Sequence, residues 1–185
     1  MKKYNNGLIV GRFQPFHLEH LRLAVAAAGR VKHLWVGITR PFGKCIPEIG
    51  GARAVDGANP LPYWLRYQCV ECALINDAGF SPTSFSILPV PLVKEIIKQI
   101  VPRGTVFLTT IMEQWGVEKE ELFRKSGLET IRMDLGAKTI SGTMIRDKIA
   151  GRDQSWKDFV PKHMRERYAS VIETYVLNSG DIILN

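Results

Sequence analysis

Residues 11–20 read GRFQPFHLEH and directly follow the apolar run Leu8 to Val10. A short apolar run that ends at a glycine predicts a buried strand followed by a tight turn. From His17 to Ala28 the chain is rich in leucine and alanine, and a glycine follows, which predicts a helix. A strand, a glycine turn and a helix in this order are typical of the first unit of an α/β sheet.

The same alternation continues along the chain. We expect further strands at 34–39, 85–90, 105–109 and, at an edge of the sheet, 129–133. Apolar stripes predict helices at 60–79, 92–101 and 162–178, and we expect a charged helix at 116–126 and another helix near 142–150. Strands that alternate with helices pair in parallel through right-handed crossovers. The predicted fold is therefore α/β, a three-layer Rossmann-like domain with a mainly parallel sheet of about five strands. Residues 1–185 form one domain, whose C-terminal helices begin at about 142.

Composition and charge limit the classes of partner. The 185 residues carry a net charge of +7, which suits either a nucleic acid or a small polyanion. The basic residues are scattered and are not interleaved with aromatic ones, which favours the small anion. No apolar run approaches the ~20 residues of a membrane helix, and none near the start suits a signal peptide. We therefore expect a cytoplasmic protein without membrane contacts.

Three cysteines, Cys45, Cys69 and Cys72, are too few for a disulfide framework. The last two form a C-x-x-C pattern inside a predicted helix, and no second Cys/His pair has zinc spacing. A structural role is favoured over metal binding or redox chemistry.

The opening stretch collects groups that bind phosphate. Ligands of parallel sheets bind at the carboxyl ends of the strands, and Gly11 lies at such an end. Arg12 adds a guanidinium fork, and His17 and His20, three residues apart, share one face of the first helical turn. The helix N-terminus adds free N–H groups. Together they predict a polyphosphate site; the alternative is that both histidines only cap and pack.

A second stretch of the same kind is TISGTMIR, at 139–146. Ser141, Gly142 and Thr143 supply hydroxyl and N–H groups at another helix start, and Arg146 follows one turn later. The alternative is a plain N-cap. Two helix starts suited to anions in one parallel-sheet domain favour a binding site.

GRFQPFH-x-x-H together with ISGTMIR resembles the nucleotidyltransferase superfamily, whose signatures are H-x-G-H and I-S-S/G-T-x-I-R. Over most of the chain it is most similar to archaeal-type nicotinamide-nucleotide (NMN) adenylyltransferases. The pattern F-L-T-x-x-x-x-x-W-G, from Phe107 to Gly116, is similar to a branch that includes phosphonate cytidylyltransferases.

The resemblance implies transfer of NMP from a Mg²⁺-bound nucleoside triphosphate to a small phosphorylated acceptor, with release of pyrophosphate. ATP with NMN is placed slightly ahead of CTP with a small phosphonate or phosphate. Mg²⁺ is the implied cofactor, bridging phosphates without a defined set of protein ligands. A non-catalytic nucleotide-binding module is the alternative of another class, and nucleic-acid binding has little support. A homo-oligomer is left open.

The resemblance also implies roles for the residues of this chain that match positions in the family motifs. The implied catalytic residues are His17, His20 and Arg146. The implied nucleotide-binding residues are Gly11, Arg12, Phe13, Gln14, Phe16, Thr110, Ile140, Ser141, Gly142 and Thr143. The implied acceptor-binding residues are Lys44, Arg53 and Trp115, and the last could equally be a core aromatic.

The chain departs from the family pattern in three places. Glu19 replaces the glycine of H-x-G-H, so its carboxylate either repels phosphate, points away or helps to hold metal. Ala58 stands where a basic residue usually precedes Asn-Pro, and Arg40, Lys44 or Arg53 is the expected substitute. The stretch that grips the nicotinamide nucleotide is replaced by the predicted helix at 92–101, which lowers the rank of NMN as acceptor.

Overall fold

The computed structural model describes residues 3–43, 58–110 and 114–179. Its sheet has five parallel strands in the order β3-β2-β1-β4-β5. The strands are β1 (Tyr4–Gly11), β2 (Val31–Ile38), β3 (Phe85–Pro89), β4 (Thr105–Thr109) and β5 (Glu129–Arg132). Every predicted strand is present, and β5 lies at an edge as expected.

Helices connect the strands and complete the C-terminal part. They are α1 (Leu18–Ala28), α2 (Tyr63–Cys72), the π-helical turn η4 (Ala73–Asp77), α3 (Lys94–Ile100), α4 (Gln114–Lys125), α5 (Gly142–Ala150), the 3₁₀ turn η5 (Gln154–Phe159) and α6 (Lys162–Asn178). The predicted helix at 92–101 is shorter at its start, because Val93 is extended and serves as the N-cap. The short turn η5 was not predicted.

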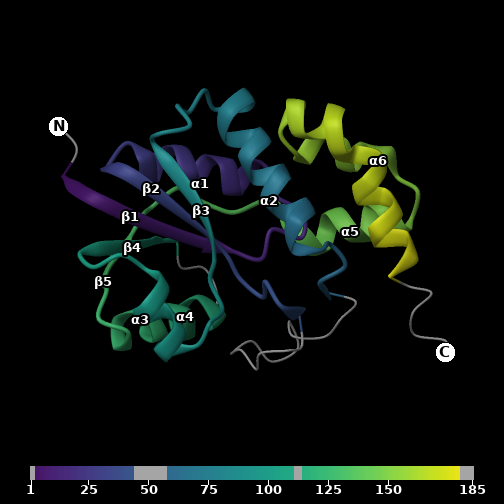
Figure 1. Cartoon of the computed structure of the whole chain (residues 1–185). Coiled ribbons are helices and arrows are strands. Elements are labelled where there is room, and N and C mark those ends of the chain that lie inside the picture. The colour runs from purple at the N-terminus through teal and green to yellow at the C-terminus, as the bar shows by residue number, and fades with distance from the viewer. Residues whose placement is uncertain (1–2, 44–57, 111–113, 180–185) are drawn as a thin grey trace.

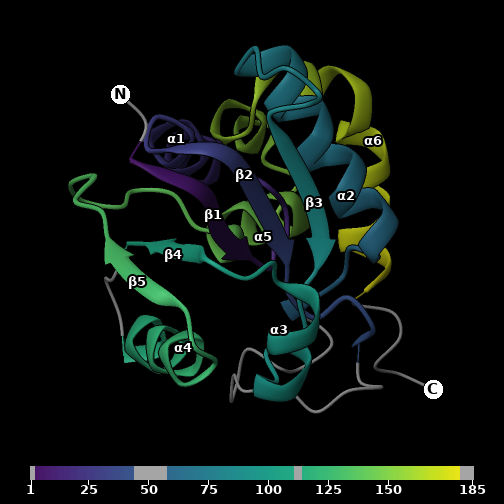
Figure 2. The same ribbon diagram turned by 60° about the vertical axis from the view of Figure 1, so that its left-hand side comes forward.

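Helices cover both faces of the sheet, as Figures 1 and 2 show. In β1, Ile9 points into the core formed with α1, α2, α5 and α6, whereas Leu8 and Val10 point into the core formed with α3 and α4. Successive side chains of a strand alternate between faces, so a wholly buried run such as LIV is what a doubly covered strand requires. The three-layer α/β prediction is confirmed.

The strand order reverses beside β1, where β2 continues one way and β4 the other. Arg66, a buried residue of α2, joins the loops at this edge. Its Nη1 donates to the carbonyls of Arg12 (2.9 Å) and Thr39 (2.7 Å), and its Nη2 donates to that of Arg40 (2.9 Å). The loops that follow β1 and β2 are therefore held together by one guanidinium at the switch point of the sheet.

Cys69 and Cys72 lie buried on α2. Burial raises the pKa of the Cys69 thiol to about 12, so this thiol stays protonated at neutral pH, which fits a structural role. Cys45 lies outside the described residues. No described helix is both long and apolar enough to cross a membrane.

Candidate active site

A cavity of about 510 Å³ opens at the switch point. Gly11, the last residue of β1, and the following residues to Gln14 line it, as do Thr39 and Thr109 at the ends of β2 and β4. His17, the N-cap of α1, and His20 within α1 also line it, together with Ser141, Gly142 and Thr143 at the start of α5. The two sequence motifs, separated by more than 100 residues in the chain, thus line one cavity.

His17 and His20 are stacked, with ring centroids 3.6 Å apart. His17 is the N-cap residue of α1, and its backbone N–H donates to Nδ1 of His20 (3.3 Å). The His20 and Phe13 rings are nearly perpendicular, with their centroids 4.9 Å apart. The prediction that both histidines lie together at the first helical turn agrees with this geometry, although His17 precedes the first helical residue.

Both imidazoles are neutral at physiological pH. Burial lowers the pKa of His17 to about 3, and the charge of Lys138 acts in the same direction. Burial likewise lowers the pKa of His20, helped by His17, Lys138, Lys119 and Arg12. A neutral imidazole offers one N–H donor and one acceptor, so the pair enters the cavity as hydrogen-bonding groups rather than as cations.

The depressed pKa of His17 predicts a pH-dependent stability. Between its folded value of about 3 and its unfolded value near 6.5, the unfolded chain binds a proton that the folded chain does not. Lowering the pH through this window therefore destabilises the fold, by at most about 1.4 kcal/mol per pH unit for one group. Urea unfolding of the wild type between pH 7 and 5 should show this slope, and His17→Asn should reduce it. An equal slope in both proteins would contradict the assignment, and His33→Asn, outside the cavity, is the control.

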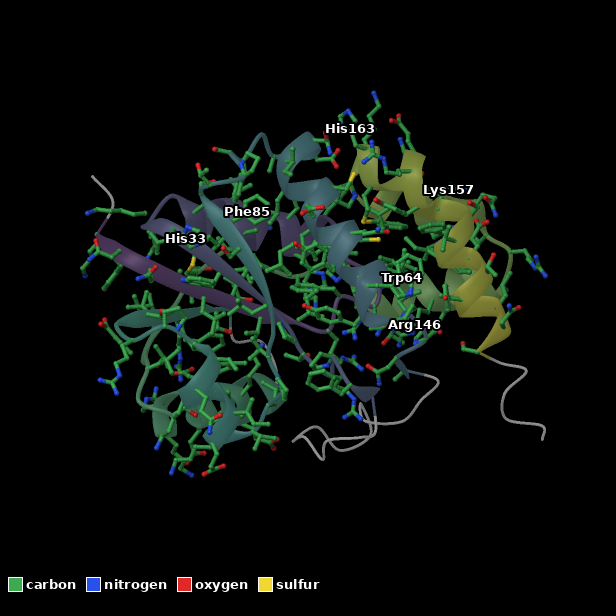
Figure 3. The ribbon with its side chains drawn as sticks, in the orientation of Figure 1. His33, Trp64, Phe85, Arg146, Lys157 and His163 are labelled. Atoms are coloured by element: carbon green, nitrogen blue, oxygen red, sulfur yellow. The ribbon has the colours of Figure 1, made fainter. Side chains whose placement is uncertain are left out.

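Arg146 joins the two motifs. It is buried on α5; its Nη1 donates to the carbonyl of Gln14 (2.8 Å) and its Nη2 to Oγ1 of Thr143 (3.3 Å). Figure 3 labels its side chain, on the side of the sheet where α5 lies. Gly142 completes the junction, because a Cβ there would lie 2.7 Å from the carbonyl oxygen of Gln14. Any side chain at this position would push the motifs apart.

The cavity is strongly cationic. Arg12, Lys119, Lys138 and Arg146 line it, and no aspartate or glutamate is among its described lining residues. In the described parts of the chain, no cluster of three His, Cys, Asp or Glu side chains could hold a metal ion. Because Mg²⁺ prefers several oxygen ligands, this lining fits a cation that arrives on phosphate oxygens better than one held by carboxylates.

Several predicted residues contribute to the structure of the site more than to its open surface. The Gln14 amide is used by Leu61, donating to its carbonyl (3.0 Å) and accepting from its N–H (2.8 Å). Phe16 is fully buried against Phe13 and is not among the described lining residues, and neither is Ile140. Gln14 itself lines the cavity, whereas Phe16 and Ile140 do not, so their assignment to the nucleotide stays a prediction.

Most of the other predicted residues line the cavity. Ser141 caps α5, its Oγ accepting from the N–H of Met144 (3.1 Å), and it also lines the cavity, so the cap and the site coexist. Gly11 lines the cavity, and a Cβ there would collide with the Phe13 ring at 2.4 Å. Thr110 and Thr143 line the cavity as expected. Lys44, Arg53 and the side chain of Trp115 lie outside the described part of the chain.

Glu19 points away from the cavity. Its Oε1 lies 3.4 Å from both the N–H and the hydroxyl of Thr139, and its Oε2 lies 3.6 Å from Nη1 of Arg22. Of the three readings of this substitution, the structure agrees with the one in which the carboxylate turns away.

The sequence analysis missed several lining residues, among them Thr39, Leu92, Lys119 and Lys138. Thr39 was detectable, because it is the last residue of a predicted strand, at the edge of the sheet where ligands bind. Lys119 and Lys138 stand in exposed, charged sequence, where no local pattern separates a lining lysine from a solvated one.

No family model matches the chain. The chain is 35% identical over 159 residues to phosphonoformate cytidylyltransferase of Streptomyces viridochromogenes, covering 84% of this chain and 85% of that protein. It is 29% identical over 171 residues to nicotinamide-nucleotide adenylyltransferase of Pyrococcus horikoshii, covering 86% and 80%.

Among solved structures, the fold matches a bifunctional NMN adenylyltransferase/ADP-ribose pyrophosphatase of Francisella tularensis with a TM-score of 0.70 and 17% identity. This match covers 98% of the present chain and 54% of the other, so the chain spans about half of that bifunctional protein. At 35% identity across most of both sequences, the first relative shows the family. The chain therefore belongs to the nucleotidyltransferase superfamily, in one family with that cytidylyltransferase, and is a nucleotidyltransferase enzyme.

Proposed function

We propose that the cavity holds a Mg²⁺-bound nucleoside triphosphate beside a small phosphonate or phosphate acceptor, and that NMP passes to the acceptor with release of pyrophosphate. One observation supports this most strongly: two neutral imidazoles and four cationic side chains converge on a cavity whose described lining has no carboxylate. Such a lining is complementary to a polyanion.

An acceptor oxygen attacks the α-phosphorus and forms the new P–O bond, while the bond from the α-phosphorus to the α–β bridging oxygen breaks. The leaving pyrophosphate carries away the electron pair of that bond. Catalysis of this kind depends on positioning and on neutralising charge, without a covalent intermediate. When bound, Mg²⁺ supplies further neutralisation of the phosphate oxygens.

Each residue has a role that its position permits. His17 and His20 donate to phosphate oxygens at the α-phosphorus, where charge develops. Arg12, which lines the cavity, orients phosphates through its planar guanidinium group. Thr143, Arg146 and the N-terminus of α5 hold the β and γ phosphates.

We place cytidylyl transfer to a small phosphonate first. The identity with phosphonoformate cytidylyltransferase, 35%, exceeds the 29% shared with the Pyrococcus horikoshii adenylyltransferase. Near the ends of β2 and β3, the described lining includes Thr39 and Leu92. The described lining contains no tryptophan or tyrosine, and its one phenylalanine, Phe13, has its ring packed against Phe16 and His20.

Adenylyl transfer to NMN is the second candidate. The two signature motifs place it slightly ahead when the sequence is taken alone. Adenylyltransferases of 27–29% identity align with more than four fifths of this chain, which supports adenylyl transfer as the alternative.

Pyrophosphate release measured with Mg²⁺ tests the proposal. ATP, CTP, GTP and UTP are each paired with NMN, phosphonoformate and a panel of other small phosphonates and phosphates. We expect release with CTP and a small phosphonate or phosphate. Release confined to ATP with NMN would replace the first candidate by the second, and no release with any pair would overturn the proposed acceptor class.

A further inference from the structure

The residue in place of the signature glycine is tied to the segment before α5. Glu19 is the second residue of α1, and its side chain is only 16% exposed. One carboxylate oxygen faces both polar hydrogens of Thr139, and the other faces Arg22, as described above. Contacts of 3.4 Å are long, so each is weak alone, but an ionised acceptor strengthens them.

Arg22 makes a second attachment to the same segment. Its Nη2 donates to the carbonyl of Leu135. Between the two attachments the backbone turns at Gly136, where φ is +72°, and the Gly136 N–H donates to Oδ1 of Asp134 (2.9 Å). Segment 135–139 is thus fastened to α1 near both of its ends, by two side chains one helical turn apart.

The segment carries Lys138 to the cavity. Lys138 immediately precedes Thr139 and lines the cavity beside the two histidines. Its charge lowers the pKa of both His17 and His20, after the larger effect of burial, which places the ammonium group near both rings. Within the described residues, no carboxylate forms an ion pair with it. A cation so placed is available for a phosphate.

We propose that Glu19, with Arg22, is a positioning residue that holds segment 135–139 so that Lys138 binds the triphosphate beside His17 and His20. The inference rests on the assignment of the triphosphate to this cavity. It gives the substitution of the signature glycine a function: the carboxylate that replaces it acts through a lysine.

The contacts argue against the two other roles of Glu19. A metal ligand would direct an oxygen into the cavity, whereas the two oxygens of Glu19 face Thr139 and Arg22. A carboxylate that repels phosphate would line the cavity, and Glu19 is absent from its described lining. Its place in the first turn also suits the helix dipole, so it costs α1 nothing.

A double-mutant cycle tests the inference, with KM for the nucleoside triphosphate and kcat measured for each variant. The variants are Lys138→Met, Glu19→Ala and the double variant. We expect Lys138→Met to raise this KM about tenfold, with kcat and the acceptor KM changed less than about threefold, because ground-state binding is lost. Lys138→Arg should restore most of the affinity. Glu19→Ala should raise the same KM about three- to fivefold.

The decisive result is the double variant. If Glu19 acts through Lys138, the double variant has the same KM for the nucleoside triphosphate as Lys138→Met alone, because no lysine is left to position. Effects that multiply would overturn the positioning role. Glu19→Gly restores the signature and is expected to resemble Glu19→Ala; wild-type or higher activity in it would also overturn the role.

The matched control is Glu121→Ala with Lys125→Met, an exposed ion pair of 2.7 Å on α4 outside the described lining, which should leave every constant unchanged. His20→Asn in the same assay separates the two levels of inference. If it lowers kcat while Lys138→Met leaves the triphosphate KM unchanged, the role of Lys138 is wrong and the site stands. If His20→Asn also has no effect, the site assignment and this inference fail together.

Discussion

His20→Asn is expected to lower kcat by about 100- to 1,000-fold, with a smaller change in the KM of either substrate. Removing one preorganised donor at a site of developing charge typically has an effect of this size. His20 meets that description, because its ring is held by stacking on His17 at 3.6 Å and by the edge contact with Phe13 at 4.9 Å. A group held this firmly needs no reorganisation when the phosphate charge develops.

The choice of asparagine follows from packing. His20 contacts three rings, those of Phe13, Phe16 and His17, so alanine would leave a hole as well as remove a donor. Asparagine keeps a polar side chain of similar length and separates the two effects. His20 is partly buried, so its replacement by alanine would affect packing as well as chemistry.

Steady-state kinetics of His20→Asn and thermal unfolding of the same protein provide the measurement. His33→Asn is the matched control, because His33 is also partly buried beside an aromatic ring, Trp35 at 4.8 Å, yet Figure 3 shows it far from Arg146. We expect His33→Asn to keep the wild-type kcat. A kcat for His20→Asn within threefold of the wild type would remove His20 from the catalytic machinery.

Arg146→Met is expected to combine a loss of activity with a loss of stability. The substitution leaves the Gln14 carbonyl without its donor and removes a positive charge from the cavity. An abandoned buried acceptor costs about 1–3 kcal/mol. Losing a charged phosphate contact of this kind lowers kcat/KM by about 100-fold or more.

Arg146→Lys separates these contributions. Lysine keeps the charge but cannot donate to Gln14 and Thr143 with the geometry of a planar fork, so activity should recover only in part. Chemical unfolding and kcat/KM are measured for both variants. Arg165→Met is the control, since Arg165 also donates to a backbone carbonyl, that of Lys157 at 3.2 Å, but lies on α6. Equal losses of activity in Arg165→Met and Arg146→Met would show that instability alone explains the effect.

Local patterns in the sequence were sufficient for the layered fold. The run at 8–10 is buried on both faces of the sheet, and the apolar stripes at 63–74 and 164–175 coincide with α2 and α6. Hydrophobic patterns of this kind repeat every two to four residues, so residues close in the sequence are enough to reveal them. The start of α3 was misplaced by about two residues, because Leu92 packs into the core from the connection after β3 and Val93 is extended.

The site was predictable where a motif lies at a strand end, and less so where contacts are distant in the chain. The sequence did not predict that the amide of Gln14 bonds to the backbone of Leu61, 47 residues later. Glu19 had three readings, and the contact that favours one of them is with Thr139, 120 residues later. No local pattern predicts such pairs.

The identities and order of the residues were enough to place Arg12, two histidines and a second helix start, that of α5, at one edge of a parallel sheet. That is because strand direction and helix starts are local properties, and parallel pairing brings their ends together. Tertiary structure alone determined the protonation of the histidines, the use of Gln14 and Arg146 as joints between the motifs, and the direction of Glu19. Burial, nearby charge and long-range hydrogen bonds arise only when distant segments pack, so these properties belong to the folded chain.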